Sequence, residues 1–188
     1  MPGPQHRPGG HGPTPHATRH AAHGIGRGDA ASVWAVTTDL TADETTDHAA
    51  IQGMVDAFFG AFVSGPGCAE RMDLLRGLLL PQAVIVRTCG MEPAVMGVEE
   101  FIAPREALLT GGSLTDFREW PATGRVEVFG DIAHWFGSYA KAGTQEGEPF
   151  TGRGMKTIQL VRTADGWRIS AAAWDDEREG LTLPTDAG

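Results

Sequence analysis

The stretch that decides the fold is MKTIQLVRTADGWRISAAAW, residues 155–174. Two largely apolar runs, Met155–Val161 and Trp167–Trp174, flank the turn signal Ala164-Asp165-Gly166. Runs rich in β-branched and aromatic residues, separated by a short segment that contains glycine, predict a β-hairpin. We therefore expect this part of the chain to form two paired antiparallel strands.

Further strands are predicted upstream. Ile132–Ala140 is almost entirely apolar, which predicts a central strand covered on both faces. Leu114–Val128 is also strand-like, and Pro121 within it indicates an edge position or a bulge. The polar segment Gly143–Glu148 predicts a hairpin loop, and Gly152-Arg153-Gly154 predicts a bulge or bend before the next strand.

Helical patterns come before these strands. A first helix is predicted from about Thr45, where an N-cap cluster precedes apolar residues at three- and four-residue spacing: Ile51, Met54, Val55, Phe58, Phe59 and Phe62. A second helix is expected over Ala69–Leu80, ended by Pro81. Val98–Leu109 is helical in pattern but contains Pro104, which indicates either a kink or a new turn that begins with proline.

Short strands at Ala83–Arg87 and Ala94–Met96 separate the second and third helices. Helices followed by a meander of long strands favour an α+β fold with an antiparallel sheet over a parallel α/β fold.

The chain divides into three parts by composition. Residues 1–29 are built mainly from His, Pro, Gly, Ala and Arg and have almost no large apolar side chains, so we interpret residues 1–44 as a disordered leader that folding does not require. A metal-binding tract is the alternative, but the irregular histidine spacing and the lack of a Cys or carboxylate cluster favour the leader. Residues 45–179 form the predicted domain, and 180–188 an exposed tail.

Composition also excludes some partners. The 188-residue chain carries a formal charge of −9, so long-range repulsion opposes binding to nucleic acid or to an anionic membrane. No apolar stretch reaches the roughly 18 residues that a membrane-spanning helix needs. Cys68 and Cys89 are too few for a disulfide framework, so reduced thiols and a cytoplasmic location are expected.

Several segments resemble one known superfamily. They are Gly130-Asp131-Ile132-Ala133-His134 at the start of a strand, the Gly152-Arg153-Gly154 run before another, and the ending Trp174-Asp175-Asp176-Glu177. With the order of elements, they resemble the nuclear transport factor 2-like superfamily, which includes SnoaL-like polyketide cyclases and ketosteroid isomerases. The resemblance implies a cone-shaped sheet, an apolar pocket between its concave face and about three helices, and a homodimer.

The residues of a ketosteroid isomerase are missing. By this resemblance, Arg87 falls where the catalytic aspartate belongs, and a guanidinium cannot act as that base. The acid donor falls on or near Thr157, and the expected tyrosine in the region of Val55, Phe58 and Phe59. We therefore do not expect ketosteroid isomerase activity.

Three residues remain as candidate catalytic groups. Arg87 can anchor a carboxylate or enolate oxygen, or form a salt bridge at a strand end with Glu92 or Asp116. His134 is a candidate acid-base group, or a hydrogen-bonded structural residue. Asp175 is a candidate acid or base if the pocket raises its pKa.

The two acidic residues after Asp175, Asp176 and Glu177, are expected to be solvated. The sequence also does not decide whether Ala133, Trp135 and Tyr139 face the pocket, or His134, Phe136 and Ser138.

Two classes of function stay open. One is an enzyme without cofactor or metal, a cyclase, isomerase or dehydratase that acts on a small apolar carbonyl compound. The other is a binding or accessory module that uses the same pocket without chemistry. In both, we expect Phe58, Phe59, Thr157 and Trp174 to contact the ligand.

A homodimer is expected through the outer face of the sheet. Trp167, Ile169, Ala171 and Ala173 are predicted to share one face of the last strand, and both faces of this strand are largely apolar. Since the helices of one chain can cover only the concave face, the other face needs a partner.

Overall fold

The computed structural model describes residues 42–184. The helices are α1 (Ala42–Gly60), α2 (Cys68–Leu78) and α3 (Val98–Thr110). The strands are β1 (Leu79–Arg87), β2 (Ala94–Met96), β3 (Leu114–Phe129), β4 (Ile132–Gln145), β5 (Glu148–Thr163) and β6 (Gly166–Asp176). The predicted leader lies outside the described residues except for positions 42–44, which belong to α1.

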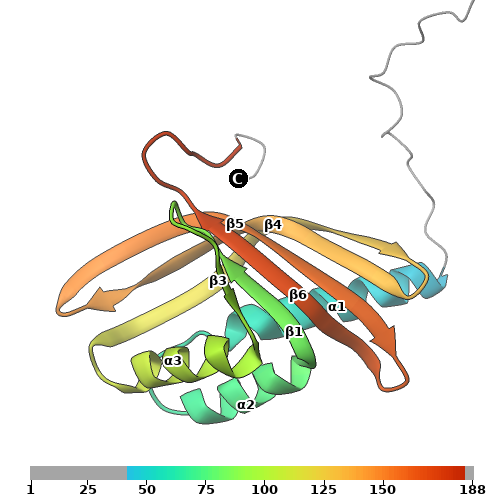
Figure 1. The fold of residues 1–188 in the computed structure, drawn as a ribbon, viewed down its shortest axis with the longest axis horizontal. Coiled ribbons are helices and arrows are strands. Elements are labelled where there is room, and N and C mark those ends of the chain that lie inside the picture. The colour runs from blue at the N-terminus through green and yellow to red at the C-terminus, as the bar shows by residue number, and fades with distance from the viewer. Residues whose placement is uncertain (1–41, 185–188) are drawn as a thin grey trace, which may run out of the picture. The chain divides into compact units, whose positions relative to one another are not determined.

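The six strands form one curved sheet in the order β2-β1-β6-β5-β4-β3. Neighbouring strands are antiparallel except for β1 and β6, which pair in parallel. Figure 1 shows the three helices on the same side of this sheet. The predicted α+β class is therefore confirmed, with one parallel pair in an otherwise antiparallel sheet.

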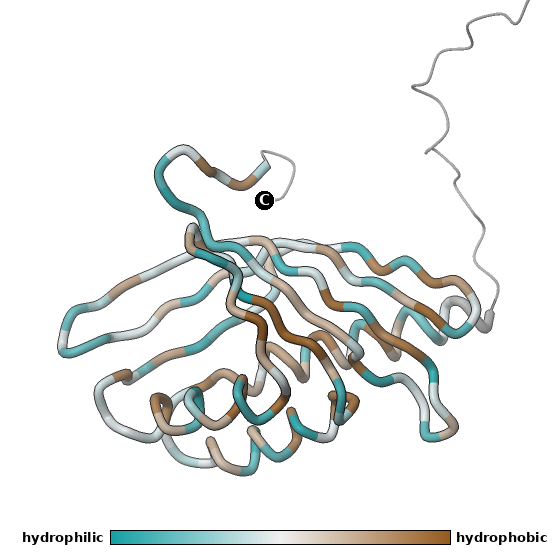
Figure 2. The backbone as a smooth tube through the Cα atoms, viewed as in Figure 1, coloured by the Kyte–Doolittle hydropathy of each residue, from teal (hydrophilic) through white to brown (hydrophobic). Residues whose placement is uncertain are grey.

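The core lies between α1, α3 and the concave face of the sheet. Phe59 of α1 packs its ring against Trp135 and Tyr139 of β4, at centroid distances of 5.6 and 6.0 Å. Figure 2 shows strongly hydrophobic positions along β1, where Ile85 is fully buried. These contacts place Trp135 and Tyr139 on the concave face and settle the strand orientation that the sequence left open.

The three prolines for which the sequence predicted a structural effect have different outcomes. The prediction that Pro81 ends the second helix is wrong, because α2 ends at Leu78 and Pro81 lies within β1. There the pairing with β6 is irregular, so the missing N–H removes no regular ladder bond. Pro104 lies inside a single helix, α3. Pro121 lies at a register shift on the edge strand β3, which confirms both parts of that prediction.

The hairpin between β4 and β5 is longer than predicted. Its strands pair as far as Gln145 and Glu148, which leaves a two-residue turn at Glu146 and Gly147. Both turn residues have positive φ angles, 53° and 91°, as a tight hairpin turn of the favoured hand requires. The predicted polar loop is therefore mostly strand, and Gly152-Arg153-Gly154 pairs with β4 without a bulge.

A bulge at Ser170 changes which side chains of β6 face the core. Ile169 pairs with Leu160 and Ala171 with Gln159, so Ser170 is an extra residue in β6. The alternation is reset there, and both Ile169 and Ala172 are buried. The prediction that Trp167, Ile169, Ala171 and Ala173 share one face is therefore wrong.

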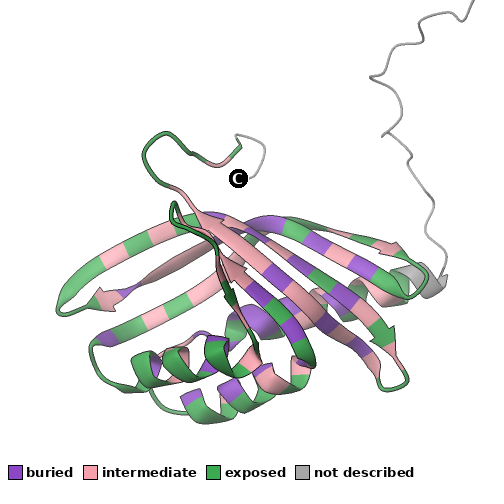
Figure 3. Cartoon of the chain, viewed as in Figure 1, coloured by how far each residue is buried: buried purple, intermediate pink, exposed green. Residues whose placement is uncertain are grey.

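The outer face of the sheet carries exposed apolar side chains. Phe129, Ile132 and Phe136 are 83%, 59% and 42% exposed. Figure 3 shows the alternation of exposed and covered residues along these strands. Within this chain the outer face of β4 is thus exposed at Ile132 and Phe136, contrary to the expectation of a strand covered on both faces.

The homodimer stays a prediction, and light scattering checks it. We expect a particle of twice the 19.9 kDa chain mass, because association covers this apolar face. Phe136→Glu should shift the particle toward monomer. Leu74→Glu, on exposed α2, should leave the mass unchanged. A monomer mass for the unchanged chain at micromolar concentration would contradict the prediction.

Candidate functional site

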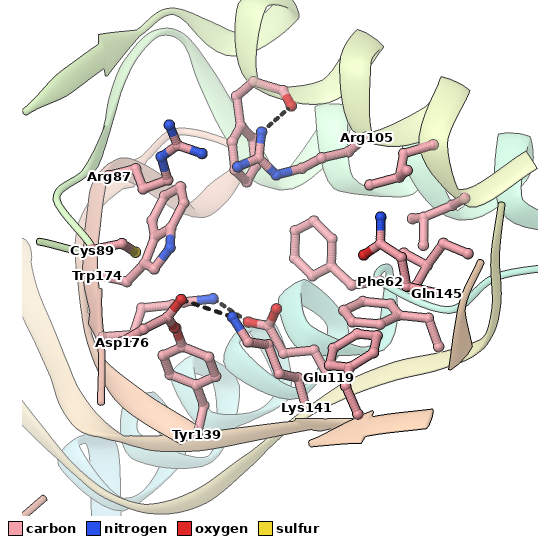
Figure 4. Close-up of a pocket in the computed structure, with 17 residues that line it drawn as sticks. Phe62, Arg87, Cys89, Arg105, Glu119, Tyr139, Lys141, Gln145, Trp174 and Asp176 are labelled. Atoms are coloured by element: carbon pink, nitrogen blue, oxygen red, sulfur yellow. Dashed lines mark hydrogen bonds and ion pairs between the residues drawn. The ribbon is translucent and has the colours of Figure 1, made fainter. Parts of the chain in front are cut away.

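A cavity of about 410 Å³ lies between α3 and the concave face of the sheet. This volume is in the range of small-molecule binding pockets. Apolar side chains form much of its lining: Phe62, Phe101, Leu108, Leu109, Leu114, Phe117, Phe150 and Trp174. The rest is polar, and Figure 4 shows several of these side chains facing one another across the cavity.

One wall of the cavity is a hydrogen-bonded cluster on β4 and β6. The hydroxyl of Tyr139 donates to Asp176 Oδ1, and Lys141 Nζ donates to Asp176 Oδ2 at 2.8 Å. Burial alone would raise the pKa of Asp176, but the hydrogen bonds from Lys141 and Tyr139 hold it below its usual value. Burial and the neighbouring Asp176 raise the pKa of Tyr139. Asp176 is therefore an ionised acceptor with both oxygens in use, which makes it a poor base.

Two glycines of β5 allow this cluster to form. Tyr139 pairs with Gly154 and Lys141 with Gly152, so both side chains cross β5 on their way to β6. A Cβ on Gly154 would lie 2.3 Å from the Asp175 carbonyl oxygen and 2.8 Å from the Tyr139 hydroxyl. A Cβ on Gly152 would lie 2.8 Å from Cε of Lys141. The Gly-x-Gly spacing thus clears one face of the strand.

We expect Gly154→Ala to destabilise the fold by about 1–3 kcal/mol, because the added methyl group overpacks a site bounded by backbone. Urea denaturation measures the change. Gly53→Ala is the matched control, since a Cβ on Gly53 meets open space on α1. It should be neutral or stabilising. Equal stability of the two variants would show that Gly154 does not have this role.

The floor of the cavity holds a buried ion pair. Lys156 of β5 is 4% exposed, and its ammonium group donates to Glu119 Oε1 on β3. The nitrogen lies 4.5 Å from the ring centroids of Phe59 and Tyr139 and 5.0 Å from that of Phe58. Burial lowers the pKa of Lys156, while Glu119 raises it and the nearby Arg105 and Lys141 lower it further.

Two arginines line the cavity without a carboxylate partner among residues 42–184. Arg105 of α3 donates to the Phe101 carbonyl at 2.7 Å, and its guanidinium lies 3.9 Å from the centroid of the Phe101 ring. Burial lowers its pKa to about 10, so it remains a cation at neutral pH. Arg87 of β1 has a buried Nε with no hydrogen-bond partner. Figure 4 shows both guanidinium groups on the side of the cavity away from Lys141 and Glu119.

Charge in the cavity is therefore unbalanced. Lys156 pairs with Glu119, and Lys141 pairs with Asp176. The guanidinium groups of Arg87 and Arg105 remain, which leaves an excess of positive charge beside aromatic rings. Such a site suits an anionic group on an apolar body, since guanidinium binds carboxylate oxygens in a bidentate geometry.

The structure does not bring the three candidate catalytic residues together. Arg87 lines the cavity, but His134 lies on the outer face, where its Nε2 hydrogen bonds to Thr157 Oγ1 at 2.6 Å. Asp175 does not line the cavity and pairs with Arg178 at 2.5 Å. The hydrogen bond from Arg178 holds the pKa of Asp175 below its usual value.

The four predicted ligand contacts also separate. Trp174 lines the cavity, whereas Thr157 lies on the other face of the sheet. Phe58 and Phe59 are fully buried and pack around the Lys156 ammonium group instead of lining the cavity. Phe62, two residues after the end of α1, lines the cavity instead.

The expectation that Asp176 is solvated is wrong, because it lies in the cavity wall two residues beyond Trp174 on the same face of β6. Glu177, by contrast, pairs with Arg153 outside the cavity. Cys68 and Cys89 are both free thiols.

Within residues 42–184, no group of three or more His, Cys, Asp or Glu side chains is placed to hold a metal ion. Over the same residues, no helix is both long and apolar enough to span a membrane.

Comparison with known proteins identifies the fold. No family model and no curated protein matches the chain. Among solved structures, the Kfla4162 protein from Kribbella flavida is 19% identical, with a TM-score of 0.60 over 71% of this chain and 93% of that one.

A nuclear transport factor 2-like superfamily protein from Salmonella enterica is 13% identical, with a TM-score of 0.57 over 77% and 98% of the two chains. A ketosteroid isomerase-like protein from Erwinia carotovora is 17% identical, with a TM-score of 0.51 over 70% and 97%. The chain therefore has the nuclear transport factor 2-like fold, as its sequence predicted. At these identities the similarity concerns the fold alone.

Proposed function

We propose that this protein is a binding module for a small apolar carbonyl compound that carries an anionic oxygen group, such as a carboxylate. One observation carries the proposal. Two guanidinium groups, from Arg87 and Arg105, line a largely aromatic cavity and have no carboxylate partner among the described residues.

A ligand anion would supply the hydrogen-bond acceptors and the negative charge that these two guanidinium groups lack. Arg87 has an unpartnered buried Nε, and Arg105 uses one nitrogen on a backbone carbonyl. Hydrogen bonds that involve a charged group are about twice as strong as neutral ones, and removal from water strengthens them further. The apolar body of the ligand would pack against Trp174 and Phe101, whose ring centroids lie 5.9 Å apart.

The binding module is favoured over the enzyme that the sequence predicted, with Arg87, His134 and Asp175 as catalytic groups, because these three groups do not meet in the cavity. A catalytic mechanism in which Arg87 polarises the carbonyl needs a proton carrier within hydrogen-bond reach of the same ligand. His134 lies on the outer face, and Asp175 is paired with Arg178. Asp176 is in the cavity, but its two oxygens already accept hydrogen bonds from Tyr139 and Lys141.

Heteronuclear NMR with hydrocinnamate as the probe tests the proposal. The sequence contains five tryptophans, each of which gives one indole N–H signal, and Trp174→Phe assigns the signal from the cavity. Hydrocinnamate should shift the Trp174 signal and leave that of Trp120, which does not line the cavity, in place. No shift at Trp174 at millimolar probe would overturn the proposal.

A further inference from the structure

Lysine is rare in this chain and concentrated at one place. The 188 residues include two lysines, Lys141 and Lys156, against thirteen arginines. Both lysines line the same cavity. A primary amine can attack a carbonyl carbon, which a guanidinium at neutral pH does not do.

The two amines have different surroundings. The side chain of Lys141 is 24% exposed and pairs with the carboxylate of Asp176. That of Lys156 is 5% exposed, pairs with Glu119 and is enclosed by aromatic rings. Burial and the nearby cations Arg105 and Lys141 lower the pKa of Lys156 and favour the neutral, nucleophilic amine, whereas the ion pair with Glu119 raises that pKa.

We propose that Lys156 forms an imine with the carbonyl group of a ligand whose carboxylate is held by Arg87 and Arg105, which makes an aromatic or apolar α-keto acid the fitting class of ligand. The inference rests on the proposed binding function and adds a covalent step to it. It also explains why a buried lysine lines the cavity, since binding an anion through two arginines does not require this lysine.

The step balances without any further reactant. Lys156 transfers one proton to Glu119, and its lone pair then attacks the carbonyl carbon, so that a C–N bond forms while the carbonyl π electrons move to oxygen. The oxygen takes up the proton from Glu119 and a proton from nitrogen, and it leaves as water as the C=N bond forms. The ammonium group and the ketone thus give a protonated imine and water, Glu119 returns to its carboxylate form, and nothing is oxidised or reduced.

Glu119 is suited to carry the proton because it is the hydrogen-bond partner of the Lys156 amine and lines the same cavity. Its side chain is 13% exposed, so bulk water does not replace it easily. Lys141 has no comparable proton carrier. Its partner Asp176 also accepts a hydrogen bond from Tyr139, and the pKa of Asp176 is held below its usual value.

Reductive trapping tests the inference. The full-length protein is incubated with phenylpyruvate and sodium cyanoborohydride, which converts an imine into a stable secondary amine. Intact mass and peptide mapping then locate the adduct. We expect one adduct per chain, on Lys156, which persists in Lys141→Arg and is lost in Lys156→Arg. Hydrocinnamate, which has the carboxylate but no ketone, should suppress the labelling by competition.

The outcomes separate the two proposals. If hydrocinnamate shifts the Trp174 signal but Lys156 stays unlabelled, the imine is excluded and the binding function stands. If no probe binds, both fail. Label found on Lys141 or on the terminal amine instead of Lys156 also overturns the inference. Lys156→Arg keeps the positive charge opposite Glu119, and mapping of the unchanged protein decides the site even if this variant does not fold.

Discussion

Replacing Glu119 with leucine should destabilise the fold by about 3–5 kcal/mol at neutral pH, because removal of one partner leaves a buried charge without compensation. Lys156 is 4% exposed and would then lie among Phe58, Phe59 and Tyr139 with no carboxylate beside it. The cost has an upper limit, since Lys156 can lose its proton. At pH 7 that loss costs about 4.6 kcal/mol for an ordinary lysine, at 1.36 kcal/mol per pKa unit.

This upper limit gives the variant a characteristic pH dependence. In Glu119→Leu, Lys156 is neutral in the folded state and charged in the unfolded state, so the unfolded state binds more protons. Stability then rises with pH, and the difference from the unchanged protein should shrink by about 1.4 kcal/mol for each pH unit from 7 to 9.

Two controls accompany the measurement by urea denaturation. Glu127→Leu removes a glutamate from the same strand, where it pairs with Arg125 at the exposed surface, so its effect should be much smaller. The double variant Glu119→Leu with Lys156→Met should recover most of the lost stability, because neither charge remains. A loss no larger than that of Glu127→Leu would contradict the buried ion pair.

The second large effect concerns binding. Replacing both Arg87 and Arg105 with glutamine should weaken hydrocinnamate binding by about a hundredfold or more, because each hydrogen bond to a charged group contributes about 1.5–3 kcal/mol. The fold should tolerate the change better than loss of Glu119, since neither arginine forms an ion pair within the described residues.

The controls for this variant distinguish the loss of an anion-binding group from a general disturbance of the cavity or the fold. Arg153→Gln removes an arginine that pairs with Glu177 outside the cavity, and it should leave the affinity unchanged. The neutral amide of the probe should bind the double variant and the unchanged protein about equally. If the double substitution weakens amide and carboxylate binding alike, the two arginines do not act as an anion anchor.

Most of the fold follows from local patterns in the sequence. Apolar spacing in Ile51–Phe62 and the turn signal at Ala164-Asp165-Gly166 located α1 and the last hairpin, because these signals need only neighbouring residues. The wrong predictions concern positions whose structure depends on pairing between strands that are far apart in the sequence. A proline after an apolar helical run predicts a helix end at Pro81, but the irregular pairing of β1 with β6 accommodates this residue within a strand.

The site was harder to predict because its residues depend on strand orientation. The predicted Asp175 and Thr157 are each one position from a residue that lines the cavity, Asp176 and Lys156. A strand shows alternate residues to opposite faces, so an error of one position reverses the face. Nothing in the local sequence marked the extra residue Ser170, which resets the alternation in β6.

Two signals in the sequence did point to the missed residues. Gly152 and Gly154 lie two positions apart, and this spacing clears one strand face for the long side chains of a neighbour. The chain also uses lysine at only two positions, both within predicted strands or directly after one. Arg105 carried no such signal, because its place beside the cavity depends on how α3 packs against the sheet.

The central claim is that the cavity recognises an anionic group on an apolar body. The ratio of two dissociation constants tests it most directly: those of hydrocinnamate and of its neutral amide for the unchanged protein, both followed at the Trp174 indole signal. The two probes have nearly the same size and differ in charge. We predict that the carboxylate binds at least about tenfold more tightly, a difference of about 1.4 kcal/mol. Equal affinities, or tighter binding of the amide, would contradict the claim.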